Sequence, residues 1–228
     1  MLLQKLKNQF IVPHFGVKFS IMSAGVFGMG LFLSFLIEAN FGTDPCSFMN
    51  RNVAGTIGLS LGNYQVIANA VMFIMSLIFA RNLIGFGTVF NWFFIGYIAD
   101  FFCALWAKTG LHDFIIDGSN MHWRIVIFAF AIIGFVISAA SYMNAQMGVA
   151  PYDALALIIS RWVSKVPFFA LRICYDMLAI GIGVFASLSN PKGMQGSLLG
   201  SVILALSIGP AVTIVGNWMK AHVLNFSE

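Results

Sequence analysis

Two charged side chains, Arg172 and Asp176, stand inside an otherwise apolar stretch, residues 166–188. A spacing of four residues places both on one face of a helix, where they can pair. If the helix crosses a membrane, each charge costs at least about 2.5–3.5 kcal/mol to insert, so such residues usually face the interior and mark a binding site or an ion pathway. The alternative is a structural ion pair near the end of the helix, with Arg172 reaching toward water.

A second polar pair with the same spacing, Gln65 and Asn69, lies in another apolar stretch. Polar side chains on one helix face either line a polar cavity or form hydrogen bonds between neighbouring helices. We expect Gln65 and Asn69 to face Arg172 and Asp176 across a shared cavity and to bind the solute with them.

Two more acidic residues, Asp44 and Asp153, lie at the start of short segments that open with a proline. Asp44 precedes Pro45 and is a natural N-cap, and Asp153 would be the third helical residue after Pro151, a favourable place for a negative charge. Helix capping is one interpretation of both residues. The other is a solute-binding role, in which a carboxylate at the helix N-terminus disfavours an anion and favours a cation or an amine.

Asp100 stands near the end of a further apolar stretch, after Tyr97. A carboxyl group that is removed from water titrates closer to neutral pH than an exposed one. We therefore consider Asp100 a candidate for proton coupling.

The composition identifies the class of protein. Of 228 residues, 60% are hydrophobic and 9% are charged, with a net charge of +4, whereas soluble domains have roughly 25% charged residues. This excludes an ordinary cytosolic enzyme, a nucleic-acid-binding protein and a disordered chain. The three cysteines match no disulfide or metal-binding spacing. We find neither a nucleophile–base pair nor a phosphate-binding loop, so we expect no enzymatic activity, cofactor or metal.

The apolar stretches predict an all-α integral membrane protein with about six transmembrane helices, because about 20 apolar residues cross a bilayer. The expected spans are residues 19–37, 64–80, 82–107, 125–147, 166–188 and 193–219, the last with a kink at Gly209-Pro210.

Two segments, residues 44–58 and 150–165, are too short to cross comfortably. Each follows a glycine that allows a sharp turn (Gly42, Gly148) and begins at a proline suited to a first helical turn (Pro45, Pro151). We expect re-entrant half-helices, which protein or a water-filled cavity must surround. Amphipathic helices at the membrane surface are the alternative.

The chain also resembles itself at a shift of about 106 residues, which drifts to 109 toward the end. The matched positions include Gly28 with Gly134, Gly42 with Gly148, Pro45 with Pro151, Gln65 with Arg172 and Asn69 with Asp176. Each half contains three spans and one half-helix, an odd number of crossings, so the second repeat is inverted relative to the first. If the short helices crossed fully, the repeats would be parallel.

The predicted organisation has five parts. They are a cytoplasmic N-terminal segment (1–18), repeat one (19–107), a loop (108–124), repeat two (125–219) and a cytoplasmic tail (220–228). The first helix is long enough to cross and lacks a cleavage site, so we expect it to be uncleaved. With both termini in the cytoplasm, seven Lys and Arg residues lie inside and four outside, as the positive-inside rule favours.

The combination of these motifs resembles the bacterial YitT/YczE-type membrane proteins over residues 28–210. The resemblance implies a polytopic bacterial inner-membrane protein and no settled substrate. In one departure between the two halves, Ala150 stands where the first half has Asp44. The residues that carry the resemblance are Gly42-Thr43-Asp44-Pro45, Gly62, Asn69, Gly148-Val149-Ala150-Pro151-Tyr152-Asp153, Arg172, Asp176 and Gly209-Pro210.

The sequence favours a secondary transporter or facilitator for a small polar, charged or zwitterionic solute. The alternative is an accessory or regulatory membrane protein that acts through a partner, although its longest loop offers little docking surface. The expected partners are the lipid bilayer and the solute, with no nucleic acid. Gly196 and Gly200 would permit close helix contact in a homo-oligomer.

Overall fold

Six long apolar helices dominate the computed structural model, which describes residues 13–223. Each of the six is long and apolar enough to cross a membrane, and the described part of the chain contains no strand. This confirms the predicted all-helical structure and indicates a multi-pass membrane protein. The six are α2 (Phe15–Ala39), α4 (Leu61–Phe79), α5 (Phe86–Thr109), α7 (Met121–Asn144), α9 (Phe168–Ser187) and α10 (Leu198–His222).

Two shorter helices follow the first and fourth long helices. They are α3 (Pro45–Ile57) and α8 (Pro151–Trp162), at the positions where short segments are expected. The 108–124 segment holds α6 (Leu111–Ile116) and a 3₁₀ turn, Gly118–Asn120, and a further 3₁₀ turn, Arg81–Leu83, joins α4 to α5. Helix α10 continues through Pro210.

Short polar residues define where several helices begin. The hydroxyl of Ser60 accepts a hydrogen bond from the Asn63 amide at the start of α4, and the hydroxyl of Ser197 accepts one from the Gly200 amide at the start of α10. Such caps satisfy backbone N–H groups that have no partner inside the helix.

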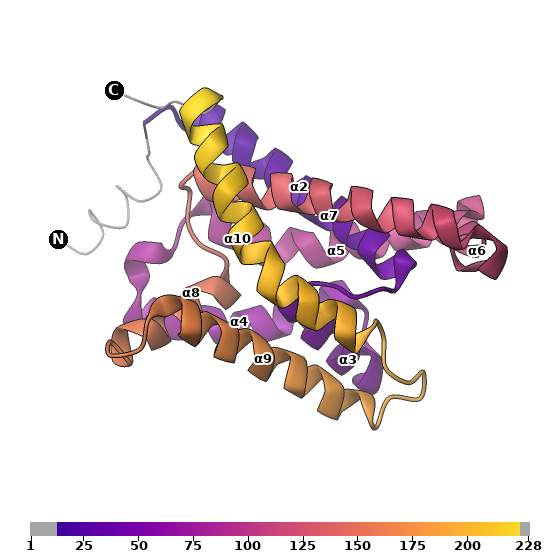
Figure 1. The fold of residues 1–228 in the computed structure, drawn as a ribbon. Coiled ribbons are helices and arrows are strands. Elements are labelled where there is room, and N and C mark those ends of the chain that lie inside the picture. Colours follow the sequence, from indigo (N-terminus) through magenta and orange to yellow (C-terminus); the bar gives the residue numbers. More distant parts are fainter. Residues whose placement is uncertain (1–12, 224–228) are drawn as a thin grey trace.

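Helices α2 and α7 lie side by side and form the centre of the packing (Figure 1). Helix α5 packs against α2, and α10 crosses from α9 to α7. Helix α4 packs against α5 and α8, while α9 packs against α3. The short helices α3 and α8 meet in one apolar cluster, to which α3 contributes Met49 and α8 contributes Tyr152.

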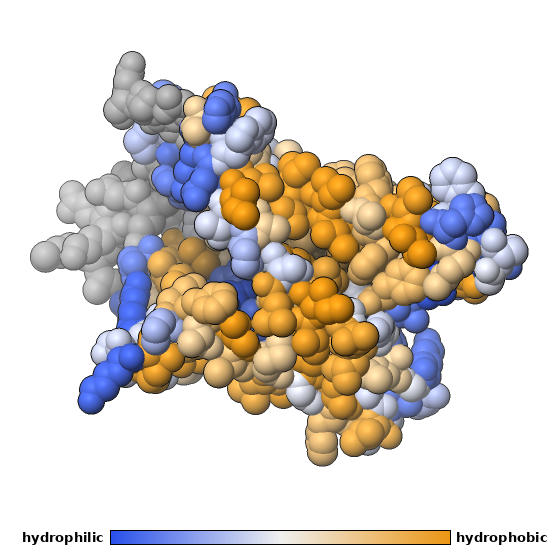
Figure 2. Space-filling model, viewed as in Figure 1, coloured by the Kyte–Doolittle hydropathy of each residue, from blue (hydrophilic) through white to orange (hydrophobic). Residues whose placement is uncertain are grey.

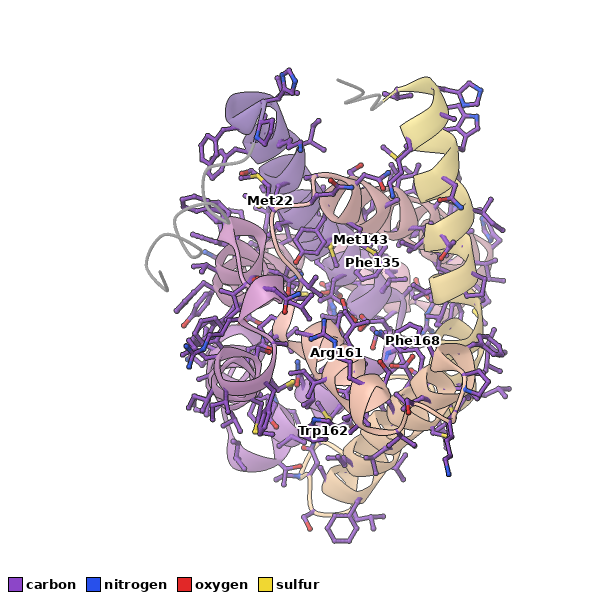
Figure 3. The ribbon with its side chains drawn as sticks, turned by 90° about the vertical axis from the view of Figure 1, so that its left-hand side faces the viewer. Met22, Phe135, Met143, Arg161, Trp162 and Phe168 are labelled. Atoms are coloured by element: carbon purple, nitrogen blue, oxygen red, sulfur yellow. The ribbon has the colours of Figure 1, made fainter. Side chains whose placement is uncertain are left out.

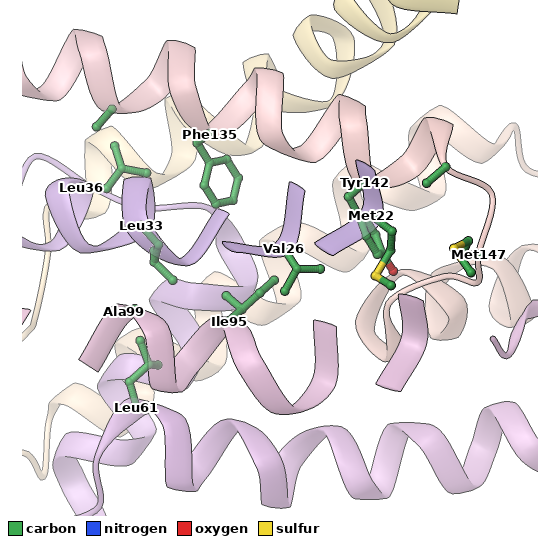
Figure 4. Packing of buried hydrophobic residues seen from close by; sticks show 12 residues of the cluster. Met22, Val26, Leu33, Leu36, Leu61, Ile95, Ala99, Phe135, Tyr142 and Met147 are labelled. Atoms are coloured by element: carbon green, nitrogen blue, oxygen red, sulfur yellow. The ribbon is translucent and has the colours of Figure 1, made fainter. Parts of the chain in front are cut away.

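The main apolar core lies between α2, α5 and α7 (Figure 4). Its side chains are almost fully buried, which removes them from both water and lipid. They include Met22, Val26, Leu33 and Leu36 from α2, Ile95 and Ala99 from α5, and Phe135 and Tyr142 from α7.

The outer surface is also apolar. Figure 2 shows a hydrophobic band across the middle of the molecule, with hydrophilic residues at its two ends. The large hydrophobic side chains exposed on the surface include Val71, Phe185, Leu199 and Ile214. An apolar exterior of this extent is typical of helices that face lipid.

The loops before the two short helices cross to the other half of the chain. The amide of Thr43 donates a hydrogen bond to the Ser201 hydroxyl of α10 (3.1 Å). The amide of Gly87 in α5 donates to the carbonyl of Met147 (2.7 Å), and that of Val149 donates to Leu83 (2.9 Å). Each loop is therefore fixed against the beginning of a long helix from the opposite half.

Gly200 makes the first of these crossings possible. A Cβ atom at this position would lie 1.6 Å from the carbonyl oxygen of Phe41 in the same chain. Gly181 on α9 has free space around it, because a Cβ atom at this position would meet nothing within 4 Å.

We predict that Gly200→Ala lowers the melting temperature in detergent, because the new methyl group forces backbone apart and overpacking costs about 1–3 kcal/mol. Gly181→Ala is the matched control and should leave stability unchanged or raise it, since alanine favours a helix over glycine by up to about 1 kcal/mol. Thermal unfolding followed by tryptophan fluorescence measures both. Equal melting temperatures would contradict the close approach at Gly200.

Candidate functional site

The guanidinium of Arg172 bridges two carboxylates. Its Nε donates to Oδ2 of Asp176 at 3.0 Å, one helical turn further along α9. Its Nη1 donates to Oδ1 of Asp153 in the first turn of α8 at 2.7 Å. Charge-assisted hydrogen bonds of this kind are about twice as strong as neutral ones, so Arg172 ties α8 to α9.

Two tyrosines complete this network. The hydroxyl of Tyr152 donates to Oδ1 of Asp176 at 2.8 Å, and the hydroxyl of Tyr175 donates to the carbonyl of Tyr152 at 3.2 Å. The Arg172 guanidinium carbon lies 5.4 Å from the centre of the Tyr152 ring. Sequence reasoning missed both tyrosines, although Tyr152 lies inside the Pro151-to-Asp153 motif and Tyr175 lies three residues after Arg172.

The network extends from the interior to the surface. Asp176 is buried, with 4% of its surface exposed, whereas the side chains of Arg172 and Asp153 are 31% and 37% exposed. Arg172 lies one turn into α9, whose first residue, Phe168, is at the end of the molecule that faces the viewer in Figure 3. Arg161 of α8 lies near the centre of that end (Figure 3).

Asp44 caps α3 and lies near the same network. Its Oδ1 accepts a hydrogen bond from the Ser47 amide at 3.1 Å, while its buried Oδ2 has no hydrogen-bond partner among the described residues. Burial raises the pKa of the Asp44 carboxyl, the bond from Ser47 opposes this, and the charges of Asp176 and Asp153 raise it further. Asp44 therefore takes up a proton at a higher pH than an exposed aspartate does.

The two polar residues of α4 have different surroundings. Asn69 is 2% exposed, and its Oδ1 has no hydrogen-bond partner within the described chain. Met72, three residues further along α4, packs against the cluster of Met49, Tyr152 and Ala179, so Asn69 lies on the side of α4 that faces α3 and α8. Gln65 is directed toward α5, with its Oε1 close to Gly96.

Asp100 lies apart from this network. Its Oδ2 accepts a hydrogen bond from the Gly62 amide at 2.7 Å, so it stabilises the beginning of α4, and it also lines a separate pocket. Its role in proton coupling stays a prediction.

The turn residues have the geometry that their types favour. Gly42 and Gly148 have φ values of +129° and +113°. Residues with a Cβ atom rarely adopt such a backbone conformation. Pro45 and Pro151 are the first residues of α3 and α8. These turns bring the N-termini of both short helices back toward the protein.

Hydrogen-bond acceptors are in surplus at the site. Two carboxylates surround one guanidinium, and the buried Oδ2 of Asp44 and Oδ1 of Asn69 are unpartnered within residues 13–223. Unpartnered buried acceptors favour a ligand that brings donors, such as an ammonium or a hydroxyl group. Within the same residues, no group of three or more potential metal ligands occurs.

Comparisons with known proteins give a family and one distant relative. The uncharacterized protein YyaS of Bacillus subtilis (strain 168) is 22% identical over 186 residues, which are 80% of this chain and 86% of YyaS. No solved structure matches the chain. The model of a family of unknown function, DUF6198, matches residues 17–217. This match does not name the YitT/YczE-type family that the motifs resemble, and nothing in it conflicts with that resemblance. The chain belongs to the DUF6198 family.

Proposed function

We propose that this protein is a secondary transporter or facilitator that moves a small polar, charged or zwitterionic solute across the bacterial inner membrane. The observation that carries the proposal is the Arg172 network with Asp153 and Asp176 in a bundle of apolar helices. Ionic groups among membrane helices are costly and usually mark a substrate or ion pathway.

The packing supports two repeats with a common arrangement. Helix α3 packs against α9 as α8 packs against α4, and α5 packs against α2 as α10 packs against α7. Each pairing therefore has a counterpart when the halves are exchanged. The first residues of α3 and α8 are 106 positions apart, and those of α5 and α10 are 112 apart. The shift between equivalent positions of the two halves therefore rises to 112, which is more than the 109 found by matching the sequence with itself.

The lengths and places of α3 and α8 support re-entrant helices. They have 13 and 12 residues, or roughly 20 Å at 1.5 Å per residue, which is less than the roughly 30 Å of a bilayer core. Their first halves approach each other, because Cys46 and Met49 of α3 pack in one cluster with Tyr152 of α8. Half-helices that enter from opposite sides are typical of inverted repeats, whose sites lie at the repeat interface near the midplane.

The chemistry of the site narrows the class of solute. The unpartnered acceptors of Asp44 and Asn69 suit the ammonium or hydroxyl end of a solute. Nη2 of Arg172 takes part in neither ion pair, so it is the donor that a carboxylate end would meet. A small amine or a zwitterion therefore fits better than a simple anion.

The resemblance to YitT/YczE-type proteins and the distribution of Lys and Arg support a bacterial inner-membrane protein with both termini in the cytoplasm. Seven of these positive residues lie on the cytoplasmic side and four on the other side in this orientation, as the positive-inside rule favours.

We predict that proteoliposomes take up one or more members of a defined panel of labelled solutes, namely methylammonium, ethanolamine, glycine and acetate, with acetate transported least. Asp176→Asn and Arg172→Gln should lower this uptake by about tenfold or more, because each removes a charge from the network that is proposed to contact the solute. Asp117→Asn, at an exposed acid outside the network, is the control. Wild-type uptake in both network variants would remove the network from the mechanism.

A second prediction concerns water inside the bundle. In a variant without the three native cysteines, Asn69→Cys should react with a charged, water-soluble thiol reagent about tenfold or more faster than Val71→Cys, which lies on the exposed apolar surface. Reaction rates in membranes measure the difference. Equally slow labelling would indicate a packed interior and favour an accessory protein over a transporter.

The third prediction tests the inversion. Leu59→Cys follows the end of α3, and Ser164→Cys follows the end of α8. If the repeats are inverted, an impermeant thiol reagent added to intact cells labels only one of them, and permeabilised cells are needed for the other. Labelling of both from the same side would support parallel repeats with fully crossing short helices.

A further inference from the structure

We infer a second binding site, distinct from the Arg172 network, for a small monovalent oxyanion such as a carboxylate. The site is a pocket of about 290 Å³ between α3, α5 and the loop from α9 to α10. This volume is at the lower end of the range for small-molecule sites, roughly 300–1,000 Å³. The polar side chains that line it are Arg51, Asp100, Cys103, Lys192 and Gln195.

Helix α3 separates the two sites. Cys46, Met49 and Val53 lie on one face of α3 and pack with Tyr152 and Tyr175 of the network. The pocket is lined by the opposite face, which carries Arg51, Ala54, Gly55 and Gly58. Both sets follow the spacing of three or four residues that marks one side of a helix.

Two buried donors around the pocket lack partners. Arg51 lines the pocket, and Asn190 lies beside Gly55 of the pocket wall. Nη1 of Arg51 and Nδ2 of Asn190 are both buried without a hydrogen-bond partner in the described part of the chain. Oδ1 of Asn190 accepts from the Lys192 amide at 3.0 Å, which fixes Nδ2 as the free end. A buried donor without a partner is unfavourable, and more so when it is charged, so an anion that binds there would remove this penalty.

Gly55 leaves room for two side-chain amide groups beside α3. A Cβ atom at this position would lie 2.3 Å from Nε2 of Gln195 and 2.6 Å from Nδ2 of Asn190. The absence of a side chain therefore lets both amide groups approach α3, in the part of the helix that lines the pocket with Arg51.

The loop that forms the outer wall is held in place before any ligand binds. Asn52 is fully buried, and its side chain bonds the backbone of Gln195 twice. Its Nδ2 donates to the Gln195 carbonyl at 3.1 Å, and its Oδ1 accepts from the Gln195 amide at 2.8 Å. A wall that is already ordered lowers the entropic cost of binding.

The charges select a monovalent anion. Arg51 and Lys192 are positive and Asp100 is negative, which gives the lining a net charge of +1. Glu38, a carboxylate outside the lining that also acts electrostatically on Arg51, is paired with His112. Lys192 is exposed at the mouth of the pocket and attracts anions from solution, while Asp100 disfavours a second negative charge.

The test uses the purified full-length protein in detergent, with sodium acetate as the probe and sodium chloride at equal ionic strength as the reference. Acetate should raise the melting temperature progressively with concentration, because a ligand that binds the folded state stabilises it. Equilibrium dialysis with labelled acetate gives the affinity directly.

Arg51→Gln should weaken acetate binding by about tenfold or more, since it removes the charged donor. Because this change also removes an unpaired buried charge, the variant should fold at least as stably as the wild type without acetate. Lys192→Gln, on an exposed loop, should weaken binding by a smaller factor. Arg161→Gln, at an exposed arginine on α8, is the control and should bind as the wild type does.

Three results would overturn the proposal. They are no acetate-dependent stabilisation, equal affinity in the wild type and Arg51→Gln, and tighter binding of phosphate than of acetate. None of them bears on solute uptake through the Arg172 network, so the two sites are tested independently.

Discussion

The constraint on which the structure depends is the need to neutralise Arg172 among apolar helices. One acid, Asp176, comes from the same helix, and the other, Asp153, comes from the start of α8. Charge-assisted hydrogen bonds of this kind are stronger than neutral ones. The first turn of α8 must therefore stay against α9, and this requirement determines where the preceding loop turns back into the protein.

The two loops before α3 and α8 meet this requirement in the same way. Each turns at a glycine with positive φ and is fixed by backbone hydrogen bonds against the beginning of a long helix of the other half. The close contact between Gly200 and Phe41 is one consequence. Both sides of α3 thereby acquire polar surroundings, with the ion network on one face and the Arg51 pocket on the other.

Local features of the sequence predicted much of this structure. Apolar length identified the six long helices, and glycine followed by proline identified the starts of α3 and α8. The spacing of four residues predicted that Arg172 and Asp176 share a face. Contacts between distant segments could not be read in this way. The bonds of Arg172 to Asp153 and of Tyr152 to Asp176 depend on how α8 meets α9. Asp100 bonds the Gly62 amide, 38 residues earlier in the chain. The wall of the Arg51 pocket is formed by Gln195, which Asn52 holds from 143 residues away.

A high-resolution cryo-EM map of the protein in lipid nanodiscs tests the central claim most directly, because it shows water and lipid around Arg172. The account predicts ordered water that reaches Asp176 between α4, α8 and α9, with Arg172 still bonded to both acids. A dry interior filled by side chains, with the guanidinium extended to lipid headgroups, would contradict it.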